Sequence, residues 1–306
     1  MTGRADEMAV GSITVRLSNT GKVLLADAIT KGDLIDYYRA IAHHILPYLR
    51  DRPLVMGRYP DGITGEAIVQ KNVPRNFPGW VSRAEVKKQG GTVCQVVCDK
   101  PATLVFLANQ ACIELHVFLS RLAALDQPDQ LVFDLDPPDA EHFSEARRTA
   151  LALRVLLEDE LGLVAYAKTT GSKGLHVNVP LRTGEHFDAV RDFARRTVKL
   201  LVSRDPEHLT TEQRKQARGP RLYLDVMRNA YAQTAVAPYS ARARPGAPVA
   251  TPLHWDELED RRLALGPFTI RTIGARLDRV CDPWADMTRH RRGLSSPRQR
   301  LQALSR

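Results

Sequence analysis

Apolar and polar positions alternate along this chain in two different rhythms. A period of two predicts strands, and apolar positions three or four residues apart predict helices. The expected strands cover residues 12–18, 52–59, 131–135, 164–168, 175–179, 222–226 and 234–238. The expected helices cover residues 30–48, 102–125, 143–161 and 187–204. Helices alternate with strands from residue 131 onward, which favours an α/β or α+β fold with a mixed sheet.

Local signals refine three segments of this prediction. Thr30 is expected to cap the helix at 30–48, with Asp33 at its third position. Residues 67–80 are rich in Pro and Asn, which predicts a loop. The last stretch, residues 284–306, contains six arginines and a Ser-Ser-Pro break, and either a helix or a disordered basic tail fits it.

Two aspartates stand at the end of the apolar run 131–135. Side chains at i and i+2 of a strand point the same way, so Asp134 and Asp136 would project side by side. Two like charges held that close repel unless a cation lies between them. Hard divalent ions with oxygen ligands, Mg²⁺ or Mn²⁺, meet that need. From this run alone, two solvated aspartates at an exposed strand end are an open alternative.

The charge balance narrows the class of partner. The chain has 44 Lys and Arg against 35 Asp and Glu, a net charge of +9, which predicts a polyanion partner. No apolar stretch reaches the ~18 residues that span a bilayer, and no Lys-rich amphipathic helix favours a membrane surface. Nucleic acid is therefore favoured over membrane. With no secretory signal recognised, we expect a cytoplasmic, nucleoid-associated protein.

The cysteines allow two interpretations. Cys94, Cys98, Cys112 and His116 could form a zinc quartet. However, three residues rather than two separate the first pair, and Cys112 and His116 would share one face of the helix expected at 102–125. Buried thiols are the better interpretation.

A third carboxylate, Asp225, lies in the strand expected at 222–226. Asp134 and Asp136 followed by a distant strand-borne Asp225 form the pattern that a two-metal phosphoryl-transfer site requires. One ion would activate an attacking 3′-hydroxyl, and the other would hold a triphosphate and the leaving pyrophosphate. Three acids are common in 306 residues, so this order alone is a weak signal.

The turn at residues 169–174 strengthens the prediction of a phosphoryl-transfer site. Its glycines let the backbone approach an anion, while Thr170, Ser172 and Lys173 supply donors and positive charge. His176 follows on the next strand, where it could donate to a phosphate. The spacing is not that of a Walker A loop. A β-hairpin turn that merely uses glycine is the alternative.

Basic side chains around these segments predict a phosphate cradle. Arg242 and Arg244 would face one way in an extended segment, and Arg218 and Arg228 flank Asp225. Each could instead be a solvated surface arginine. A second anion site is expected near the N-terminus, where Lys22 and Lys31 flank a loop and Lys31 opens a helix. Two solvated lysines are the alternative there.

In order along the chain, these segments resemble the archaeo-eukaryotic primase superfamily. The likeness is closest to the polymerase domain of bacterial end-joining DNA ligase D and its stand-alone primase-polymerase relatives. The matching segments, within about residues 12–260, are Ser18-Asn19-x-x-Lys22-Val23-Leu24, Asp33-x-x-x-Tyr37-Tyr38, Arg52-Pro53, Glu114-Leu115-His116, Phe133-Asp134-Leu135-Asp136-Pro137, Gly171-Ser172-Lys173-Gly174-Leu175-His176, Ala237-Pro238-Tyr239-Ser240 and His254-Trp255.

The resemblance implies a primase-type catalytic core with an RRM-like mixed sheet. It implies one compact domain over residues 1–283, with an N-terminal α/β portion of about 1–100, a catalytic module of about 101–283 and a basic tail at 284–306. Asp134, Asp136 and Asp225 match the metal-binding catalytic acids of a nucleotidyltransferase that uses two Mn²⁺ or Mg²⁺ ions, with Mn²⁺ favoured. The residues expected to hold the NTP or dNTP are His116, Thr170, Ser172, Lys173, His176, Arg218, Arg228, Arg242 and Arg244. Lys22 and Lys31 match lysines that grip a downstream 5′-phosphate of DNA.

Two departures shape the expected function. End-joining members carry a Phe-Phe pair on a protruding DNA-contacting loop, where this chain has Ile68 and Val69, which cannot stack on bases as aromatics do. The residues expected at that DNA loop are Arg58, Ile68, Val69, Gln70 and Lys71. Arg228 also replaces a Gln common in ligase D domains, and no nucleotidyl-lysine motif is present, so sealing would need a separate DNA ligase.

We therefore expect a template-directed polymerase that fills short gaps in gapped or primer-template DNA, with ribo- or deoxyribonucleotides, during DNA repair. An end-joining polymerase is the alternative within the class. A non-catalytic nucleic-acid-binding module and a metal-dependent nuclease that uses the same acids are the alternatives outside it.

Overall fold

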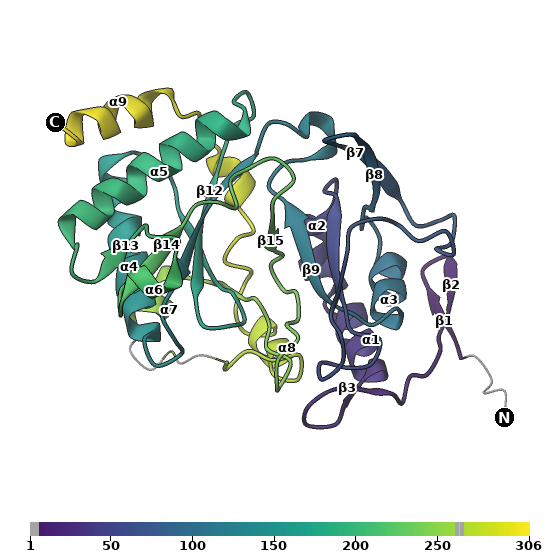
Figure 1. Cartoon of the computed structure of the whole chain (residues 1–306). Coiled ribbons are helices and arrows are strands. Elements are labelled where there is room, and N and C mark those ends of the chain that lie inside the picture. Colours follow the sequence, from purple (N-terminus) through teal and green to yellow (C-terminus); the bar gives the residue numbers. More distant parts are fainter. Residues whose placement is uncertain (1–5, 261–262, 264–265) are drawn as a thin grey trace. The chain divides into compact units, whose positions relative to one another are not determined.

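The computed structural model describes residues 6–260, 263 and 266–306 (Figure 1). Most of the N-terminal segment in which no secretory signal is recognised lies outside these residues. The chain divides into two compact units. Unit 1 comprises Met1–Phe118, Val236–Ala250 and Phe268–Arg279, and unit 2 comprises Leu119–Ala235, Thr251–Pro267 and Val280–Arg306. One compact domain over 1–283 stays a prediction.

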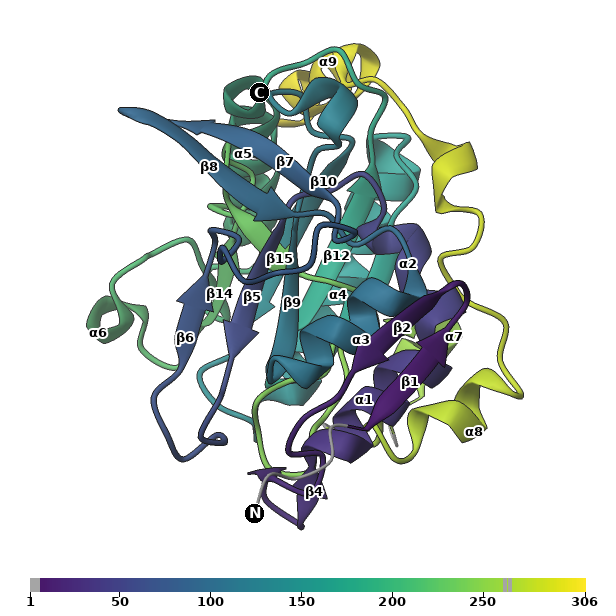
Figure 2. The ribbon, with the colours of Figure 1, turned by 90° about the vertical axis from the view of Figure 1, so that its right-hand side faces the viewer.

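Unit 1 combines three short hairpins with a sheet and its helices (Figure 2). The hairpins pair β1 (Glu7–Val10) with β2 (Ile13–Arg16), β3 (Val23–Leu25) with β4 (Ile29–Thr30), and β7 (Arg83–Lys88) with β8 (Gly91–Val96). The sheet contains β9 (Cys112–Phe118), β5 (Leu54–Arg58) and β6 (Ile68–Gln70), in the order β15-β9-β5-β6, and its edge strand β15 (Thr234–Val236) begins at the end of the unit 2 segment and ends at Val236. The helices are α1 (Lys31–Ala40), α2 (Ala42–Leu49), α3 (Pro101–Asn109) and α8 (Ile273–Leu277).

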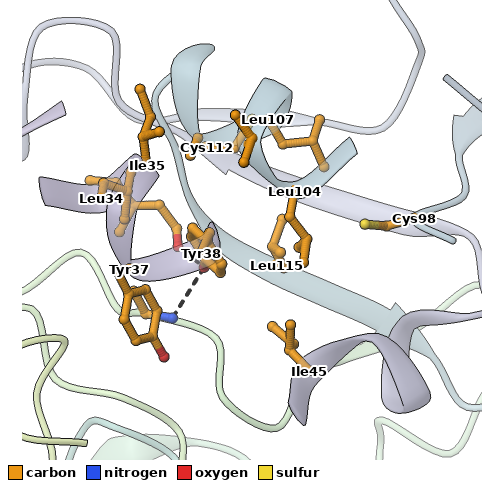
Figure 3. Packing of buried hydrophobic residues seen from close by; sticks show 14 of the residues in the cluster. Leu34, Ile35, Tyr37, Tyr38, Ile45, Cys98, Leu104, Leu107, Cys112 and Leu115 are labelled. Atoms are coloured by element: carbon orange, nitrogen blue, oxygen red, sulfur yellow. Dashed lines mark hydrogen bonds between the residues drawn. The ribbon is translucent and has the colours of Figure 1, made fainter. Parts of the chain in front are cut away.

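Two tyrosines of α1 lie inside the apolar core of unit 1 (Figure 3). The Tyr38 hydroxyl donates to the carbonyl of Ile113 at 2.7 Å and accepts from the amide of Ala241 at 3.2 Å. The Tyr37 hydroxyl donates to the carbonyl of Tyr239 at 2.7 Å. Because a buried hydroxyl without a partner destabilises a fold, these bonds let both rings pack in the core. They also attach the returning segment 236–250 to the N-terminal part of the chain.

The prediction of one helix over 102–125 is wrong. Helix α3 ends at Asn109, Ala111 takes the left-handed conformation with φ 55°, and the chain returns as strand β9. Every α3 residue after Pro101 is buried. An apolar run with no polar face carries no period that separates helix from strand. Cys112 and His116 therefore lie on a strand and not on one face of a helix.

Two smaller corrections concern the N-terminal half. The helix predicted at 30–48 is divided at Ile41 into α1 and α2, and the loop predicted at 67–80 contains β6. The capping prediction is confirmed, since the amide of Asp33 donates to Thr30 Oγ1 at 3.1 Å and the amide of Thr30 donates to the Asp33 carboxylate at 2.7 Å.

Unit 2 is built on a six-stranded mixed sheet of order β13-β14-β10-β12-β11-β16. The strands are β10 (Gln130–Asp136), β11 (Tyr166–Thr169), β12 (Leu175–Pro180), β13 (Leu209–Thr210), β14 (Leu222–Asp225) and β16 (Pro252–Leu253). Only the β13–β14 pair is parallel among these neighbours. The helices are α4 (Phe143–Val155), α5 (Phe187–Arg204), α6 (Lys215–Arg218), α7 (Trp255–Glu259) and α9 (Ser295–Leu304), with a π-helical turn at Leu156–Glu160 and 3₁₀ turns at Leu122–Ala124 and Met287–His290. The predicted mixed α/β class is confirmed.

The basic C-terminal stretch, left open as helical or disordered, contains the helix α9. It runs alongside α5 in unit 2 (Figure 1). Leu301 is buried, and Arg298 pairs with Glu185. Trp284 is also buried, and its indole N–H donates to the carbonyl of Ala167 at 2.9 Å. Across the described residues, no helix combines the length and the apolar character that a membrane span requires.

Candidate active site

Polar side chains from four neighbouring strands form one row across the unit 2 sheet. Lys168 of β11 lies opposite His176 of β12, and His176 lies opposite Asp134 of β10. Asp134 in turn lies opposite Asp225 of β14. Directly opposed residues of an antiparallel ladder point to the same face of the sheet, and so does Asp136, two residues beyond Asp134. The register therefore brings the three predicted acids to one face.

The predicted glycine turn meets the end of β10. Thr170 Oγ1 donates to the carbonyl of Gly174 at 3.0 Å and accepts from the amide of Ser172 at 3.2 Å, which orders the turn. A Cβ on Gly174 would come within 2.3 Å of the carbonyl oxygen of Leu135, so this position requires glycine. Lys173 Nζ lies 3.0 Å from Asp136 Oδ1. The turn and the acids are thus parts of one site.

The predicted arginines of unit 2 also reach the acids. Arg218 Nη1 lies 3.4 Å from Asp136 Oδ2, and its guanidinium lies 3.8 Å from the ring centre of Tyr223. This cation–π contact holds the arginine over the strand next to the acids. The charge of Arg228 acts on Asp134 and Asp225 and favours their ionised forms.

The surroundings of Asp225 disfavour the ionised form of its carboxyl. Burial raises its pKa, and the charge of Asp134 raises it further, although the amide of Met227 donates to Asp225 Oδ1 at 2.7 Å. His176 shows the opposite shift: burial, followed by the charge of Lys168, lowers the pKa of its imidazole to about 4. His176 is therefore neutral near pH 7, with Nε2 3.5 Å from Asp134 Oδ1.

The donor chemistry of the row fits a divalent cation. The three acids would offer carboxylate oxygens, which hard divalent ions prefer, and a cation between Asp134 and Asp225 would offset their repulsion. In the ranges 6–260, 263 and 266–306, however, no three acidic, His or Cys side chains are gathered as a ready metal group. Asp136 instead contacts Lys173 and Arg218. The assignment of Asp134, Asp136 and Asp225 as metal ligands stays a prediction.

Glu114, for which no role was predicted, orders the segment of unit 1 that contains Arg242 and Arg244. Glu114 Oε1 accepts from Arg242 Nε at 2.8 Å and from the amide of Ala243 at 3.1 Å. Its other oxygen lies 3.5 Å from His116 Nε2. Gly57 stands opposite on β5, where a Cβ would come within 3.0 Å of the Glu114 Cβ. The i, i+2 spacing of Glu114 and His116 would have revealed this pairing had the segment been predicted as a strand.

These donors make Glu114 a strongly ionised group. Burial opposes its charge, but the hydrogen bond from His116 and the charge and hydrogen bond of Arg242 lower its pKa to about 2. The arginine segment itself differs from the prediction of an extended stretch. The amide of Arg244 donates to the carbonyl of Arg242 at 2.9 Å, which makes a tight turn, so strand alternation does not apply to the two side chains.

The two predicted phosphate lysines are brought together in unit 1. The amide of Lys31 donates to the carbonyl of Lys22 at 2.8 Å, at the β3–β4 hairpin. Lys22 Nζ lies 2.8 Å from Asp61 Oδ1, and Lys31 Nζ donates to Ser18 Oγ at 3.4 Å. Burial and then the nearby charge of Lys22 lower the pKa of Lys31. An anion at this hairpin would therefore be favoured by both cations.

The predicted DNA loop is the end of β5 and the edge strand β6. Ile68 and Val69 are exposed there, at 43% and 69%. Arg58 Nη1 donates to Gln70 Oε1 at 2.6 Å and Arg58 Nε to the carbonyl of Gln110 at 3.0 Å. Arg58 and Gln70 thus fix the base of this strand, while the aliphatic pair faces solvent.

The zinc quartet is not formed. Cys98 and Cys112 are buried free thiols, as favoured, and Cys94 is half-buried. Burial raises the pKa of Cys98 and raises that of Cys112 to about 12, so both thiols are protonated.

Comparisons with known proteins define the family of this chain. The protein-family model described as LigD, primase-polymerase domain, matches residues 30–284 of this chain. The multifunctional non-homologous end joining proteins LigD of Mycolicibacterium smegmatis and Pseudomonas aeruginosa are both 35% identical to the chain, over 252 and 274 residues. These matches cover 81% and 89% of this chain but only 33% and 32% of the relatives.

A solved structure supports the same assignment. The polymerase domain from Mycobacterium tuberculosis ligase D, in complex with DNA, matches with a TM-score of 0.83 and 31% identity, over 90% of this chain and 98% of that domain. The chain belongs to the LigD primase-polymerase domain family. It is a polymerase-type nucleotidyltransferase, and its family transfers nucleotides with the help of metal ions. It spans about a third of the length of the LigD relatives named above.

Proposed function

We propose that this chain fills short gaps in DNA, adding ribo- or deoxyribonucleotides opposite a template and recognising a downstream 5′-phosphate. The observation that carries the proposal is the row on the unit 2 sheet. Asp134 and Asp225 lie side by side on paired strands, Asp136 projects from the same face, and the pKa of Asp225 is raised. Such a carboxylate set suits two divalent ions at a phosphoryl-transfer centre.

The side chains of the row divide the chemistry among them. Asp134, Asp136 and Asp225 would hold two ions, with Mn²⁺ favoured over Mg²⁺, and bound ions would activate the primer 3′-hydroxyl and stabilise the charge of the leaving pyrophosphate. Thr170 orders the turn through its hydroxyl, and Ser172 is the hydroxyl donor that the turn offers to the triphosphate. Lys173 and Arg218 contact Asp136. When the acids bind cations, both side chains would contact phosphate oxygens instead. Neutral His176 can only donate or accept a hydrogen bond there.

The unit 1 residues have parts in the proposal as well. His116, Arg242 and Arg244 bind the incoming nucleotide, as the resemblance implies, and Glu114 holds Arg242 in a fixed orientation. Arg228 completes the set of nucleotide-binding arginines. Lys22 and Lys31 bind the 5′-phosphate at the far side of a gap, since a dianion there offsets two neighbouring cations, one of which is buried.

The pathway has two candidates. The relatives' names place them in non-homologous end joining, which favours an end-joining polymerase as the second candidate. Gap filling is favoured by Ile68 and Val69, because exposed aliphatics on β6 offer no aromatic face to bases at a broken end. In either case a DNA ligase would seal the product.

One primer-extension experiment tests the proposal. The substrate is a one-nucleotide gap with a downstream 5′-phosphate, supplied with UTP or TTP and with Mn²⁺ or Mg²⁺. Extension is expected with both nucleotides and is expected to be faster with Mn²⁺. Asp136→Asn should abolish extension and leave DNA binding intact, whereas Asp139→Asn, an exposed acid three residues away that contacts His142, should change neither.

The alternatives give different results in the same experiment. A non-catalytic binding module predicts no extension from the parent protein. A nuclease predicts that a labelled primer is shortened when no nucleotide is present. Retained extension in the Asp136→Asn variant would refute the metal assignment.

A further inference from the structure

Strand β12 is buried along its whole length, yet it carries two polar side chains on one face. His176 and Asn178 are 4% and 3% exposed, and residues two apart on a strand point the same way. Their face is the one that carries the acids, because His176 lies opposite Asp134. Buried polar groups in folded proteins are almost always hydrogen-bonded, so the partners of this pair indicate what else the face holds.

Each of the two side chains has a partner at one end only. His176 Nε2 lies 3.5 Å from Asp134 Oδ1, and Asn178 Nδ2 donates to Gln130 Oε1 at 3.2 Å. Within the part of the chain that the structure describes, no group makes a hydrogen bond to His176 Nδ1 or to Asn178 Oδ1, although both atoms are buried. A buried acceptor without a donor destabilises a fold. A donor from outside the chain is therefore expected between them.

Both of these atoms are acceptors. A neutral imidazole carries one proton, and the carboxylate of Asp134 can only accept a hydrogen bond, so the proton belongs on Nε2. His176 Nδ1 then has a lone pair and no proton, and Asn178 Oδ1 is a carbonyl oxygen. Because two acceptors cannot bond to each other, the group that joins them has to donate two protons.

A water molecule meets this requirement. Side chains two residues apart on a strand start about 7 Å apart, and a water with two hydrogen bonds of about 2.8 Å joins atoms up to about 5.6 Å apart. Buried waters typically bond to about three polar groups of the protein. Lys168 lies opposite His176 on the other neighbouring strand, and its buried charge acts on the imidazole. That charge favours a water whose oxygen faces the ammonium and whose protons face the two acceptors.

We propose that one ordered water lies between His176 and Asn178, donates to Nδ1 and Oδ1, and keeps the imidazole proton on Nε2. The hydrogen bond made at one ring nitrogen determines which nitrogen of a histidine carries the proton. The water matters most when Asp134 binds a cation, because the carboxylate then no longer accepts from Nε2. His176 still presents a donor to the triphosphate, and Asn178, which acts through His176, is a positioning residue. The effect on the nucleotide rests on the proposed function, whereas the water and the position of the proton do not.

Two substitutions separate the acceptor from the packing around it. Asn178→Leu removes Oδ1 at a similar side-chain volume. The matched control, Gln130→Leu, removes the hydrogen bond to Asn178 Nδ2 and leaves Oδ1 in place. Melting temperatures establish that the parent and both variants are folded.

A high-resolution crystal structure locates the water. In the parent and in Gln130→Leu, a water is expected within about 3.2 Å of His176 Nδ1 and of Asn178 Oδ1, and Asn178→Leu should lack it. A protein donor at Nδ1, such as the ammonium of Lys168, or no water between the two atoms in the parent would overturn the proposal. The parent alone decides this point if Asn178→Leu does not fold.

The ¹⁵N chemical shifts of the imidazole show where the proton lies. They are measured near pH 7 without divalent ions, in the Asp134→Ala background, which removes the acceptor at Nε2. Asp134→Ala and Asp134→Ala/Gln130→Leu should both keep the proton on His176 Nε2, whereas Asp134→Ala/Asn178→Leu should carry a clear share of it on Nδ1. A proton on Nδ1 in Asp134→Ala alone, or equal spectra in all three proteins, would overturn the proposal.

Extension kinetics distinguish this proposal from the proposed function. Asn178→Leu should raise the nucleotide KM several-fold, while the KM for primer-template DNA stays unchanged and Gln130→Leu matches the parent. A nucleotide KM that is unchanged, or that rises equally in both variants, would overturn the role of Asn178. If the parent extends no primer at all, the proposed function fails, while the crystal structure and the ¹⁵N spectra still decide the place of the water and of the proton.

Discussion

Two half-buried carboxylates of the molecule, Glu114 and Asp225, differ in what surrounds them. In unit 1, Glu114 accepts hydrogen bonds from Arg242 and from the amide of Ala243, beside His116, and its pKa falls to about 2. In unit 2, Asp225 lies next to Asp134, and its pKa rises. Glu114 accepts several hydrogen bonds from protein donors, whereas Asp225 lies beside a second negative charge.

The surroundings of Glu114 and Asp225 suggest two different roles. A carboxylate whose donors come from the protein orients those donors, as Glu114 orients Arg242. A carboxylate that lies beside a second negative charge is stabilised by a cation placed between the two. The first kind positions a site, and the second kind takes part in its chemistry. Substitutions at Glu114 and Asp225 should therefore have opposite effects on stability, and the predictions below exploit this.

The largest effect is expected for Asp225→Asn. Primer extension should fall by about 10³-fold or more, since the row loses one of its acids. The metal-free variant should melt a few degrees higher than the parent, because one of two neighbouring negative charges is removed and Asn can still accept from the amide of Met227. Parallel extension and thermal melting assays check both parts. A lower melting temperature would place Asp225 in the same class as Glu114.

Glu114→Gln, unlike Asp225→Asn, should make the protein less stable. Removing the charge leaves the Arg242 guanidinium without its partner, and we expect a loss of about 2–3 kcal/mol in the free energy of unfolding. Urea denaturation of parent and variant measures it. The nucleotide KM should rise more than kcat falls, because Arg242 is misplaced while the acids are untouched. A variant as stable as the parent would show that Glu114 does not hold the arginine segment.

The free energy of unfolding at acid pH should depend on the ionisation of Glu114. Its folded pKa of about 2 lies below the ordinary 4.5, so its contribution is complete above about pH 4.5 and is lost as the pH falls toward 2. The contribution is about 3 kcal/mol. Unfolding free energies of the parent should fall over this window more steeply than those of Glu114→Gln. Parallel pH profiles would contradict the assignment.

The smallest effect is expected at the β3–β4 hairpin. Lys22→Ala with Lys31→Ala should remove the preference for a gap with a 5′-phosphate over an open template, while extension of the open template stays unchanged. Competition between the two substrates measures the preference. Because Lys31 is buried, Lys22→Ala alone serves as the control for folding. A double variant with the parent's preference would place the phosphate elsewhere.

The sequence predicts best where a local signal coincides with the final contact. The Thr30–Asp33 capping box, the helix over residues 187–204 and the three acids on strand ends needed only local spacing. The segment 102–125 failed because α3 and β9 are both buried, and a continuous apolar run has no period to separate them. Glu114 was given no role for the same reason, since the strand that aligns it with His116 was predicted as helix. Its partner Arg242 is 128 residues away, and only the tertiary fold brings the two together.

The central claim is that the carboxylate row of unit 2, and not the saturated carboxylate of unit 1, holds the divalent ions. Mn²⁺ binding measured by calorimetry on the parent, Asp225→Asn and Glu114→Gln tests it most directly. We expect Asp225→Asn to lose about tenfold or more in Mn²⁺ affinity and Glu114→Gln to bind Mn²⁺ as the parent does. Equal Mn²⁺ binding by the parent and Asp225→Asn, or a loss of binding in Glu114→Gln alone, would contradict it.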